Sequence, residues 1–240
     1  METSYSSYDY KKSIERVDEV LNSSDLNFID SDSIPARSSL TFNNGYYVNI
    51  SVLYVDIRGS KKLADNHKRP VLAKIYKTYI SEVVAALKGN AGINEIYIEG
   101  DGIWGVFATP YKSDLDRLFS TAAQVASLVD ILNIKFKKKN YSQINIGIGL
   151  AYGSSLYIKA GYKGSGINEV VWLGKVVGEA AMLCSYGNRN SSDKEIMVSS
   201  FFYDNLNDHN KSLLNWNSIR ECYHGYVVNT DMDKWVQDNK

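Results

Sequence analysis

The sequence is poor in cysteine and histidine, and this scarcity argues against disulfide-stapled and zinc-dependent proteins. Its 240 residues contain two cysteines, Cys184 and Cys222, which lack the spacing of metal ligands. We expect both to be reduced thiols in a cytoplasmic protein. The three histidines, His67, His209 and His224, are scattered along the chain, so no zinc site is predicted.

Net charge and long apolar runs are also missing. Lys and Arg together number 27, as do Asp and Glu, so the chain has no overall charge that would attract nucleic acid or a membrane surface. No apolar run approaches the roughly 20 residues that a membrane span needs, and the polar start does not resemble a signal peptide. We therefore expect a cytoplasmic protein that binds neither nucleic acid nor a membrane.

An apolar fraction of 44% is enough for one sizeable folded domain. We expect this domain over residues 46–229, preceded by a helix and polar linker over 1–45 and followed by a tail over 230–240. The N-terminal segment has a modest helical stripe within residues 8–22, formed by Ile14, Val17, Val20 and Leu21. Two partners fit that stripe, the chain's own domain or a second subunit, and the sequence does not choose between them.

Hydrophobic periodicity and turn residues predict alternating strands and helices within the domain. The expected strands cover 47–57, 143–152, 156–160 and 195–199, with hairpins at 93–108 and 213–228. The expected helices cover 61–90, 113–137, 175–187 and 201–206, and a glycine-rich loop covers 161–167. Because tight hairpins are mixed with helical connections, we predict an α+β fold rather than a doubly wound parallel sheet.

The stretch from Val52 to Ser60 predicts a buried strand that carries one carboxylate, Asp56, to its end. Four apolar residues precede a sharp turn at Gly59, and a lone Asp in such a run is costly unless it is solvated, paired or bound to a cation. Free backbone N–H groups at Gly59 and Ser60 would lie beside it. This pattern favours metal on one side and phosphate on the other.

A second carboxylate, Asp101, lies in the turn of a predicted hairpin. The Asp-Gly dipeptide between strand-forming residues is the strongest short hairpin signal. Two carboxylates on rigid elements can hold two Mg²⁺ or Mn²⁺ ions for phosphoryl chemistry. Taken singly, each motif is more often structural, as a half-buried Asp or an ordinary Asp-Gly turn.

Four stretches in this order resemble the class III nucleotide cyclases: residues 53–60, 98–107, 146–153 and 172–183. The resemblance implies a βααββαβ domain that forms a head-to-tail homodimer with active sites at the dimer interface. It also implies that Asp56 and Asp101 hold two Mg²⁺ or Mn²⁺ ions, with the carbonyl of Ile57 completing one coordination shell. The substrate would be a nucleoside triphosphate.

The resemblance extends to the chemistry of the triphosphate. The Gly59 and Ser60 N–H groups would bind it, and Arg58 is a further expected substrate-binding residue. The ribose 3′-oxygen would attack the α-phosphate and release pyrophosphate.

The chain departs from the family on the helix after the fourth motif. The Asn and Arg that usually bind the ribose and the transition state are replaced by Gly178 and Met182. Lys175, one turn earlier on the same face, and Arg189, after the helix, are candidate catalytic replacements. If both are merely surface charges, the alternative is a catalytically inactive nucleotide-binding or dimerisation module.

The base-reading positions depart as well. Tyr97 stands where adenylate cyclases have Lys and guanylate cyclases Glu, Val171 replaces a polar purine partner, and Tyr54 replaces a common Phe. A narrower pocket with a phenol suits a pyrimidine, a pattern similar to the Pycsar anti-phage cyclases. We expect UTP or CTP as substrate, with a slight preference for UTP, and a cyclic product read by a separate effector. A purine cyclase of the same fold, with the two tyrosines packed in the core, is the alternative.

Overall fold

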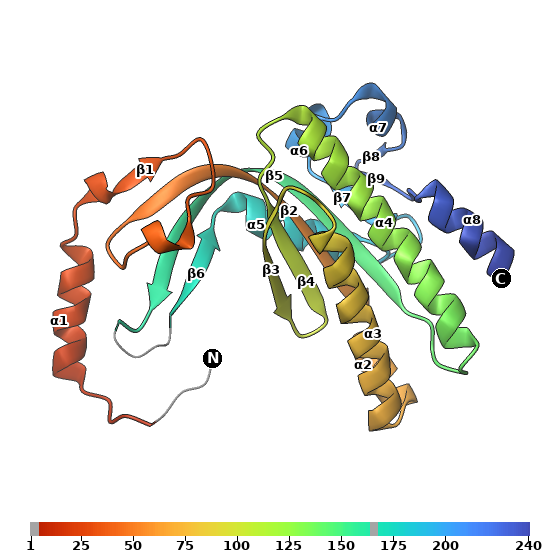
Figure 1. Cartoon of the computed structure of the whole chain (residues 1–240), viewed down its shortest axis with the longest axis horizontal. Coiled ribbons are helices and arrows are strands. Elements are labelled where there is room, and N and C mark those ends of the chain that lie inside the picture. The colour runs from red at the N-terminus through yellow and green to blue at the C-terminus, as the bar shows by residue number, and fades with distance from the viewer. Residues whose placement is uncertain (1–4, 164–167) are drawn as a thin grey trace. The chain divides into compact units, whose positions relative to one another are not determined.

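From residue 45 onward the chain forms a strand, two helices, two strands, a helix and a strand, which confirms the predicted βααββαβ order. The computed structural model describes residues 5–163 and 168–240 (Figure 1). The chain divides into two compact units. One comprises the segment up to Asn49 with Ser154–Lys175, and the other comprises Ile50–Gly153 with Val176–Lys240.

The larger unit is built on a mixed sheet. The strands are β2 (Gly45–Arg58), β3 (Ile93–Glu99), β4 (Gly102–Phe107), β5 (Asn145–Gly161), β7 (Ile196–Val198), β8 (Asn215–Asn217) and β9 (Cys222–Gly225). Their spatial order is β3-β4-β2-β5-β7-β9-β8. β4 runs antiparallel to both β3 and β2, whereas β7 runs parallel to β5. The mixture of directions confirms the α+β prediction.

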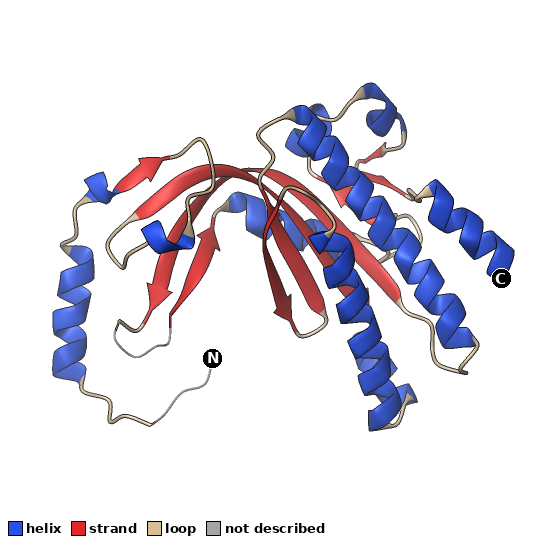
Figure 2. Ribbon diagram, in the orientation of Figure 1, coloured by secondary structure: helices blue, strands red, loops and turns tan. Residues whose placement is uncertain are grey.

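Two long helices, α3 (Arg69–Lys88) and α4 (Lys112–Lys137), pack beside one another against this sheet (Figure 2). α3 buries one face at helical spacing, from Ile75 and Tyr79 to Val83 and Leu87. These side chains form one core with the inward residues of the central strands. One face of the sheet is therefore closed by helices, and the polar side chains of β2 lie on the other.

Shorter helices complete the larger unit. α2 (Ser60–Asn66) follows β2 directly, and α5 (Lys175–Tyr186) follows β6. α6 (Ser200–Asp204) and α7 (Asp208–Ser212) connect β7 to β8, and α8 (Thr230–Asn239) packs on α4 through the buried Val236. No helix within residues 5–163 and 168–240 is long and apolar enough to cross a membrane.

The smaller unit contains α1 (Tyr10–Leu21), β1 (Phe28–Asp30) and β6 (Asn168–Leu173), with short 3-10 turns at Asp25–Asn27 and Arg37–Ser39. β1 pairs in parallel with the start of β2, and β6 pairs antiparallel with the end of β5. The ring of Tyr157 stacks on that of Trp172 across the β5–β6 pair, with centroids 4.1 Å apart. β1 and β6 therefore extend β2 and β5, the two strands that belong partly to each unit.

Several boundaries differ from the sequence-based expectation. The helix expected over 61–90 is two helices, and Pro70 lies in the first turn of the second. The two strands expected at 143–152 and 156–160 are one, because β5 continues through Gly153 by exchanging its partner β7 for β6. α7 and α8 were not predicted. Of the expected loop at 161–167, residues 164–167 lie outside the described residues.

Candidate active site

Three polar side chains lie on one face of β2 because the strand alternates. Leu53, Val55 and Ile57 point into the core, with 0 to 3% exposure, so Tyr54, Asp56 and Arg58 share the opposite face. The side chain of Asp56 is 35% exposed and that of Arg58 is 17% exposed. The predicted strand therefore delivers Asp56 to the edge of the core, where its carboxylate reaches solvent.

Asp101 lies at the tip of the β3–β4 hairpin, as predicted. The two strands are joined through Gly100 and Asp101, and Gly100 adopts a φ of 68° that glycine accepts at little cost. The pKa of Asp56 is raised, first by burial and then by the negative charge of Asp101. The register pairs Val55 with Ile103, so Asp56 and Asp101 lie at the same end of β2 and β4, and a cation between the two carboxylates would relieve their repulsion.

Arg58 fixes the orientation of Asp56 within the chain. Its Nη2 donates to Asp56 Oδ2 at 3.2 Å and to the Asp56 carbonyl at 3.3 Å. Its Nη1 donates to the carbonyl of Ser185 on α5 at 3.3 Å, and its Nη2 lies 3.5 Å from the Cys184 sulfur. The positive charge of Arg58 lowers the pKa of Asp56 and so partly offsets the effect of Asp101. A role for Arg58 in binding substrate stays a prediction.

Glycines on β5 allow α5 to come this close. A Cβ placed on Gly149 would lie 2.0 Å from the carbonyl oxygen of Ala180, and one on Gly147 would lie 2.4 Å from that of Cys184. No side chain fits at either position, so the helix backbone rests directly on the strand. The Cys184 thiol is buried, which raises its pKa to about 12, and it donates to the Gly147 carbonyl at 3.1 Å. This thiol has a structural role.

A row of aromatic rings crosses three strands beside the carboxylates. Tyr54 on β2 and Tyr97 on β3 both pair in register with Trp104 on β4. The ring of Trp104 stacks on Tyr97 with centroids 4.2 Å apart and on Tyr54 with centroids 6.2 Å apart. The two predicted base-reading tyrosines therefore flank a third ring that the sequence-based prediction omitted.

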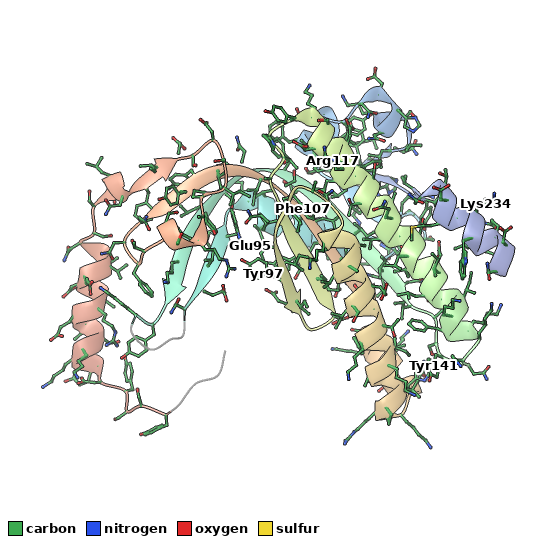
Figure 3. The ribbon with its side chains drawn as sticks, in the orientation of Figure 1. Glu95, Tyr97, Phe107, Arg117, Tyr141 and Lys234 are labelled. Atoms are coloured by element: carbon green, nitrogen blue, oxygen red, sulfur yellow. The ribbon has the colours of Figure 1, made fainter. Side chains whose placement is uncertain are left out.

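Two glutamates on β3 lie on the same face as the rings. Glu99 Oε1 accepts a hydrogen bond from Trp104 Nε1 at 3.3 Å, and the Tyr97 hydroxyl donates to Glu95. Tyr97 and Glu95 are labelled in Figure 3. Burial, and then the charge of Glu99, raise the pKa of Tyr54 to about 12. The Tyr54 hydroxyl is therefore protonated at neutral pH, and it forms a hydrogen bond with Glu99.

The remaining predicted residues occupy two places. Gly59, with φ of 69°, turns the chain from β2 into α2, whose first residue is Ser60. Lys175 opens α5, Arg189 lies three residues beyond its end, and both are exposed. Gly178 is exposed, with open space where a Cβ would lie, and Met182 is 47% exposed. This face of α5 is thus free of packing against its own chain at these positions.

The position of Trp104 beside Tyr97 could have been predicted from the sequence. A two-residue turn at Gly100 and Asp101 pairs residues whose numbers sum to 201, which sets Tyr97 opposite Trp104. Ser185 had none, because it meets Arg58 across 127 positions of sequence.

The described residues contain no group of three or more His, Cys, Asp or Glu side chains arranged around a metal ion. Mg²⁺ needs fewer, since it keeps waters and is commonly bound through one or two carboxylates plus substrate phosphates. Asp56 and Asp101 are hard oxygen donors of this kind, and their mutual repulsion gives a divalent cation a reason to bind. The residues present therefore fit a magnesium or manganese site.

Comparison with known proteins identifies the family of the chain. The model of the adenylate and guanylate cyclase catalytic domain matches residues 43–223. A uridylate cyclase of Treponema porcinum is 37% identical over 86% of this chain and 72% of its own, and one of Gulbenkiania mobilis is 33% identical over the full length of both. The adenylyl cyclase CyaB from P. aeruginosa has a similar fold, with a TM-score of 0.61 at 18% identity over 72% of this chain and 85% of its own. The chain therefore belongs to the adenylate and guanylate cyclase catalytic domain family and is a nucleotide cyclase.

Proposed function

We propose that this cyclase converts UTP into 3′,5′-cyclic UMP and pyrophosphate, and we assign that chemistry to residues 46–229. The observation that carries the proposal is the strand register, which pairs Val55 with Ile103 and so brings Asp56 and Asp101 to the same end of β2 and β4. The rings of Tyr54, Trp104 and Tyr97 line the adjoining face. Both similar relatives compared above are named uridylate cyclases. The ring row offers stacking surface and a phenol in place of the polar partners that a purine needs.

Asp56 and Asp101 would hold two Mg²⁺ or Mn²⁺ ions, together with the Ile57 carbonyl. When bound, such ions make the ribose 3′-hydroxyl more acidic and stabilise charge on the leaving pyrophosphate. The chain's own part is to keep both carboxylates ionised and oriented, which the hydrogen bonds of Arg58 serve for Asp56. Gly59 and Ser60 would present backbone N–H groups to the triphosphate. The 3′-oxygen forms a bond to the α-phosphorus as the bond to the pyrophosphate oxygen breaks.

Base selection would follow from the absence of the usual purine-binding side chains and from the tyrosines that replace them. Val171 offers no polar group to a purine edge, and the Tyr97 hydroxyl already donates to Glu95. Each polar group of a purine left unpaired would cost about 1–3 kcal/mol. The hydroxyl of Tyr54, which is hydrogen-bonded to Glu99, would offer a polar group to the pyrimidine edge. Stacking of Tyr54 and Tyr97 on Trp104 holds both rings in place.

The active site would be completed by a second copy in a head-to-tail homodimer. The exposed face of α5 that carries Lys175, Gly178 and Met182 is the part of the chain that would reach the partner's carboxylates. Lys175 or Arg189 would then supply the cation that the family usually places at position 182. Resemblance to the Pycsar cyclases implies that the product is a second messenger, read by a separate effector in anti-phage defence.

The substrate is tested by incubating the purified protein with each of the four nucleoside triphosphates and Mn²⁺, then identifying cyclic products by mass. Cyclic UMP should dominate, and Asp56→Ala should remove it. Tyr54→Phe should lower UTP turnover about 2- to 12-fold, corresponding to a hydrogen bond of ~0.5–1.5 kcal/mol. Tyr97→Lys should raise ATP turnover relative to UTP. A dominant purine product would overturn the proposal.

The shared site is tested by mixing inactive chains. Asp56→Ala chains combined with Lys175→Ala chains should recover part of the cyclic UMP activity, because some heterodimers keep one unmutated site. Mixing Asp56→Ala with Asp101→Ala chains is the matched control and should recover no activity. Each chain supplies both carboxylates of one site, so each site of such a heterodimer lacks one carboxylate. Equal recovery in both mixtures, or none in the first with heterodimers demonstrated, would contradict the shared site. For the biological role, cyclic UMP should rise in cells carrying this protein after phage infection.

A further inference from the structure

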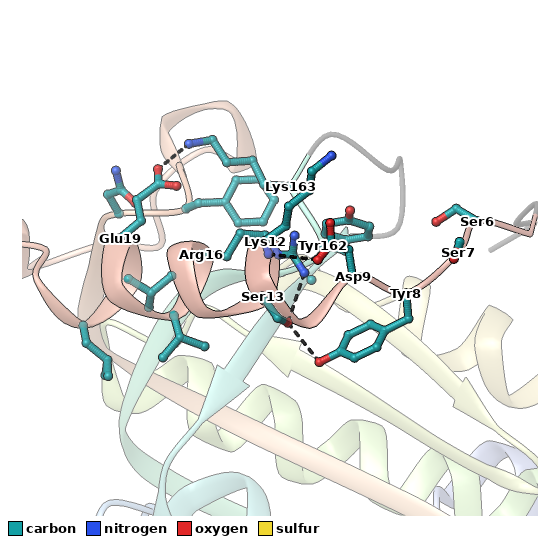
Figure 4. A pocket seen from close by; sticks show the side chains of 16 residues that line it. Ser6, Ser7, Tyr8, Asp9, Lys12, Ser13, Arg16, Glu19, Tyr162 and Lys163 are labelled. Carbon is teal, nitrogen blue, oxygen red and sulfur yellow. Dashed lines mark hydrogen bonds and ion pairs between the residues drawn. The ribbon is translucent and has the colours of Figure 1, made fainter.

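Helix α1 faces its own unit with its polar side. The Arg16 guanidinium lies 4.8 Å from the ring centre of Tyr162, and Glu19 Oε1 accepts from Lys163 Nζ at 2.6 Å (Figure 4). Arg16 and Glu19 are three positions apart and therefore lie on neighbouring parts of one helix face. Most surface helices of globular proteins do the reverse and turn their apolar side inward.

The opposite side of α1 is apolar and uncovered. Tyr10, Ile14, Val17 and Leu21 follow one another at intervals of four, three and four residues, which is the spacing of a coiled-coil seam. Their exposures are 62, 56, 53 and 76%, and α1 has no buried residue within the described structure. A hollow of about 830 Å³ runs along its flank and is lined in part by Val17 and Phe42. A row of large apolar side chains left in water at this spacing marks an interaction surface.

We propose that α1 pairs in antiparallel fashion with α1 of a second copy of this chain. In an antiparallel pair centred between Ile14 and Val17, Ile14 of each copy lies opposite Val17 of the other. Tyr10 then lies opposite Leu21, so all four apolar residues of each helix meet an apolar partner. Because each contact occurs twice about a two-fold axis, this interface joins two copies, and it adds to the head-to-tail contact proposed above.

Charge along the seam selects this orientation. Lys11 and Asp18 flank the apolar row on one side and are seven positions apart, so both occupy the same coiled-coil position. An antiparallel pair sets Lys11 of one helix near Asp18 of the other, twice. A parallel pair would instead set these positions against the other flank of the partner helix, where Ser13 and Val20 carry no charge. The sequence of α1 is therefore complementary to itself in one orientation only.

The apolar face of α1 is less suited to binding a membrane surface. Interfacial helices combine an apolar side with a polar side rich in Lys and Arg. α1 carries three basic residues and three acidic ones, and its Arg16 and Glu19 are already engaged with the β5–β6 segment. The α1 pairing does not depend on which nucleotide the cyclase uses.

Charge reversal gives a sharp test, read by sedimentation velocity and native mass spectrometry. Lys11→Glu alone and Asp18→Lys alone each convert two attractive pairs into two repulsive ones and should weaken self-association roughly tenfold. A mixture of the two variants restores opposite charges across the pair, so heterodimers should exceed the statistical half. Lys12→Glu, on the opposite side of the helix, is the matched control and should associate like the unmodified chain. Val17→Asp should weaken association roughly a hundredfold, because two apolar layers are lost.

Unchanged self-association in Lys11→Glu, Asp18→Lys and Val17→Asp would overturn the proposal. A heterodimer fraction of one half in the mixture, as expected from chance, would also overturn it. So would binding of the unmodified protein to phosphatidylcholine–phosphatidylglycerol vesicles, if Val17→Asp abolished that binding. Cyclic UMP formation is measured separately at protein concentrations where each variant remains dimeric, and Lys11→Glu should leave it unchanged. Absence of cyclic UMP from the unmodified protein would contradict the proposed function and leave the α1 pairing standing.

Discussion

Replacing Gly149 by alanine should damage both stability and catalysis, whereas the same change at Gly153, on the same strand, should damage neither. A Cβ on Gly149 would lie 2.0 Å from the Ala180 carbonyl oxygen and 2.4 Å from the Cys184 nitrogen, both backbone atoms of α5. A Cβ on Gly153 would have its nearest neighbour at 3.7 Å, the Cβ of Val176, which is an ordinary contact. The two glycines lie in the same β-strand, and they differ in the space that is available for a methyl group.

The magnitude follows from the movement that the new methyl group demands. Ordinary contact begins at 3.4 Å, so α5 would have to retreat by about 1.4 Å at Ala180 to admit the methyl group. Overpacking of this kind costs about 1–3 kcal/mol or more, since backbone rather than a flexible side chain must move. The 3.3 Å bond from Arg58 to the Ser185 carbonyl would lengthen beyond hydrogen-bonding range. Asp56 would lose its support from α5, and displacements of ~1 Å near reacting groups can cost about 100-fold in rate.

Urea unfolding and initial rates of cyclic UMP formation measure the two effects. Gly149→Ala should unfold at lower urea and turn over about 100-fold more slowly, while Gly153→Ala should match or slightly exceed the unmodified stability, by about 0.4–1 kcal/mol. Equal behaviour of the two variants, in either direction, would refute the assignment of α5 as the support of Asp56.

Three further outcomes are expected. Asp101→Asn should abolish the cyclic product, as measured by mass analysis. It should not lower the melting temperature, because the negative charge of Asp101 raises the pKa of Asp56 and removing that charge relieves the repulsion between the two side chains. Thr109→Val leaves the buried hydroxyl of Ser51 without its 2.7 Å partner and should cost about 1–3 kcal/mol in urea unfolding, whereas adding Ser51→Ala should recover most of that loss. Burial raises the pKa of Glu195 to about 7, so stability should fall as pH rises from about 4.5 to 7. Glu195→Gln should therefore gain up to roughly 3 kcal/mol at pH 8 and almost nothing at pH 4.5.

Elements whose pattern is local were predictable from the sequence. The alternation of Leu53, Val55 and Ile57 with polar neighbours depends on consecutive residues, and it placed Asp56 on the correct strand end. The Gly100–Asp101 turn fixed the hairpin and its register in the same way. The order of strands and helices followed from these local signals and from the resemblance to the cyclase family.

Features that depend on distant partners were not predictable. The sequence of β5 does not indicate that its pairing partner changes from β7 to β6. Gly153 was therefore predicted to end the strand, whereas it is an interior residue. α8 buries little beyond Val236, and its stability comes from α4, about 100 positions earlier in the chain. The bond between Arg58 and Ser185 joins residues 127 positions apart. Residue types at such sites carry no signal until the fold has brought them together.

Helix α5 serves two tasks at different points along its length. Its C-terminal half, through Cys184 and Ser185, meets Arg58 and so holds the carboxylate of Asp56 in the same chain. Its earlier positions Gly178 and Met182 are exposed, on the face that the proposed homodimer turns toward the other active site. A rigid helix that contacts two sites transmits movement between them, because a shift at one end displaces the other. Binding of nucleotide against the exposed face of α5 should therefore alter the position of Asp56 in that same chain, and the two active sites of a dimer should be coupled rather than independent.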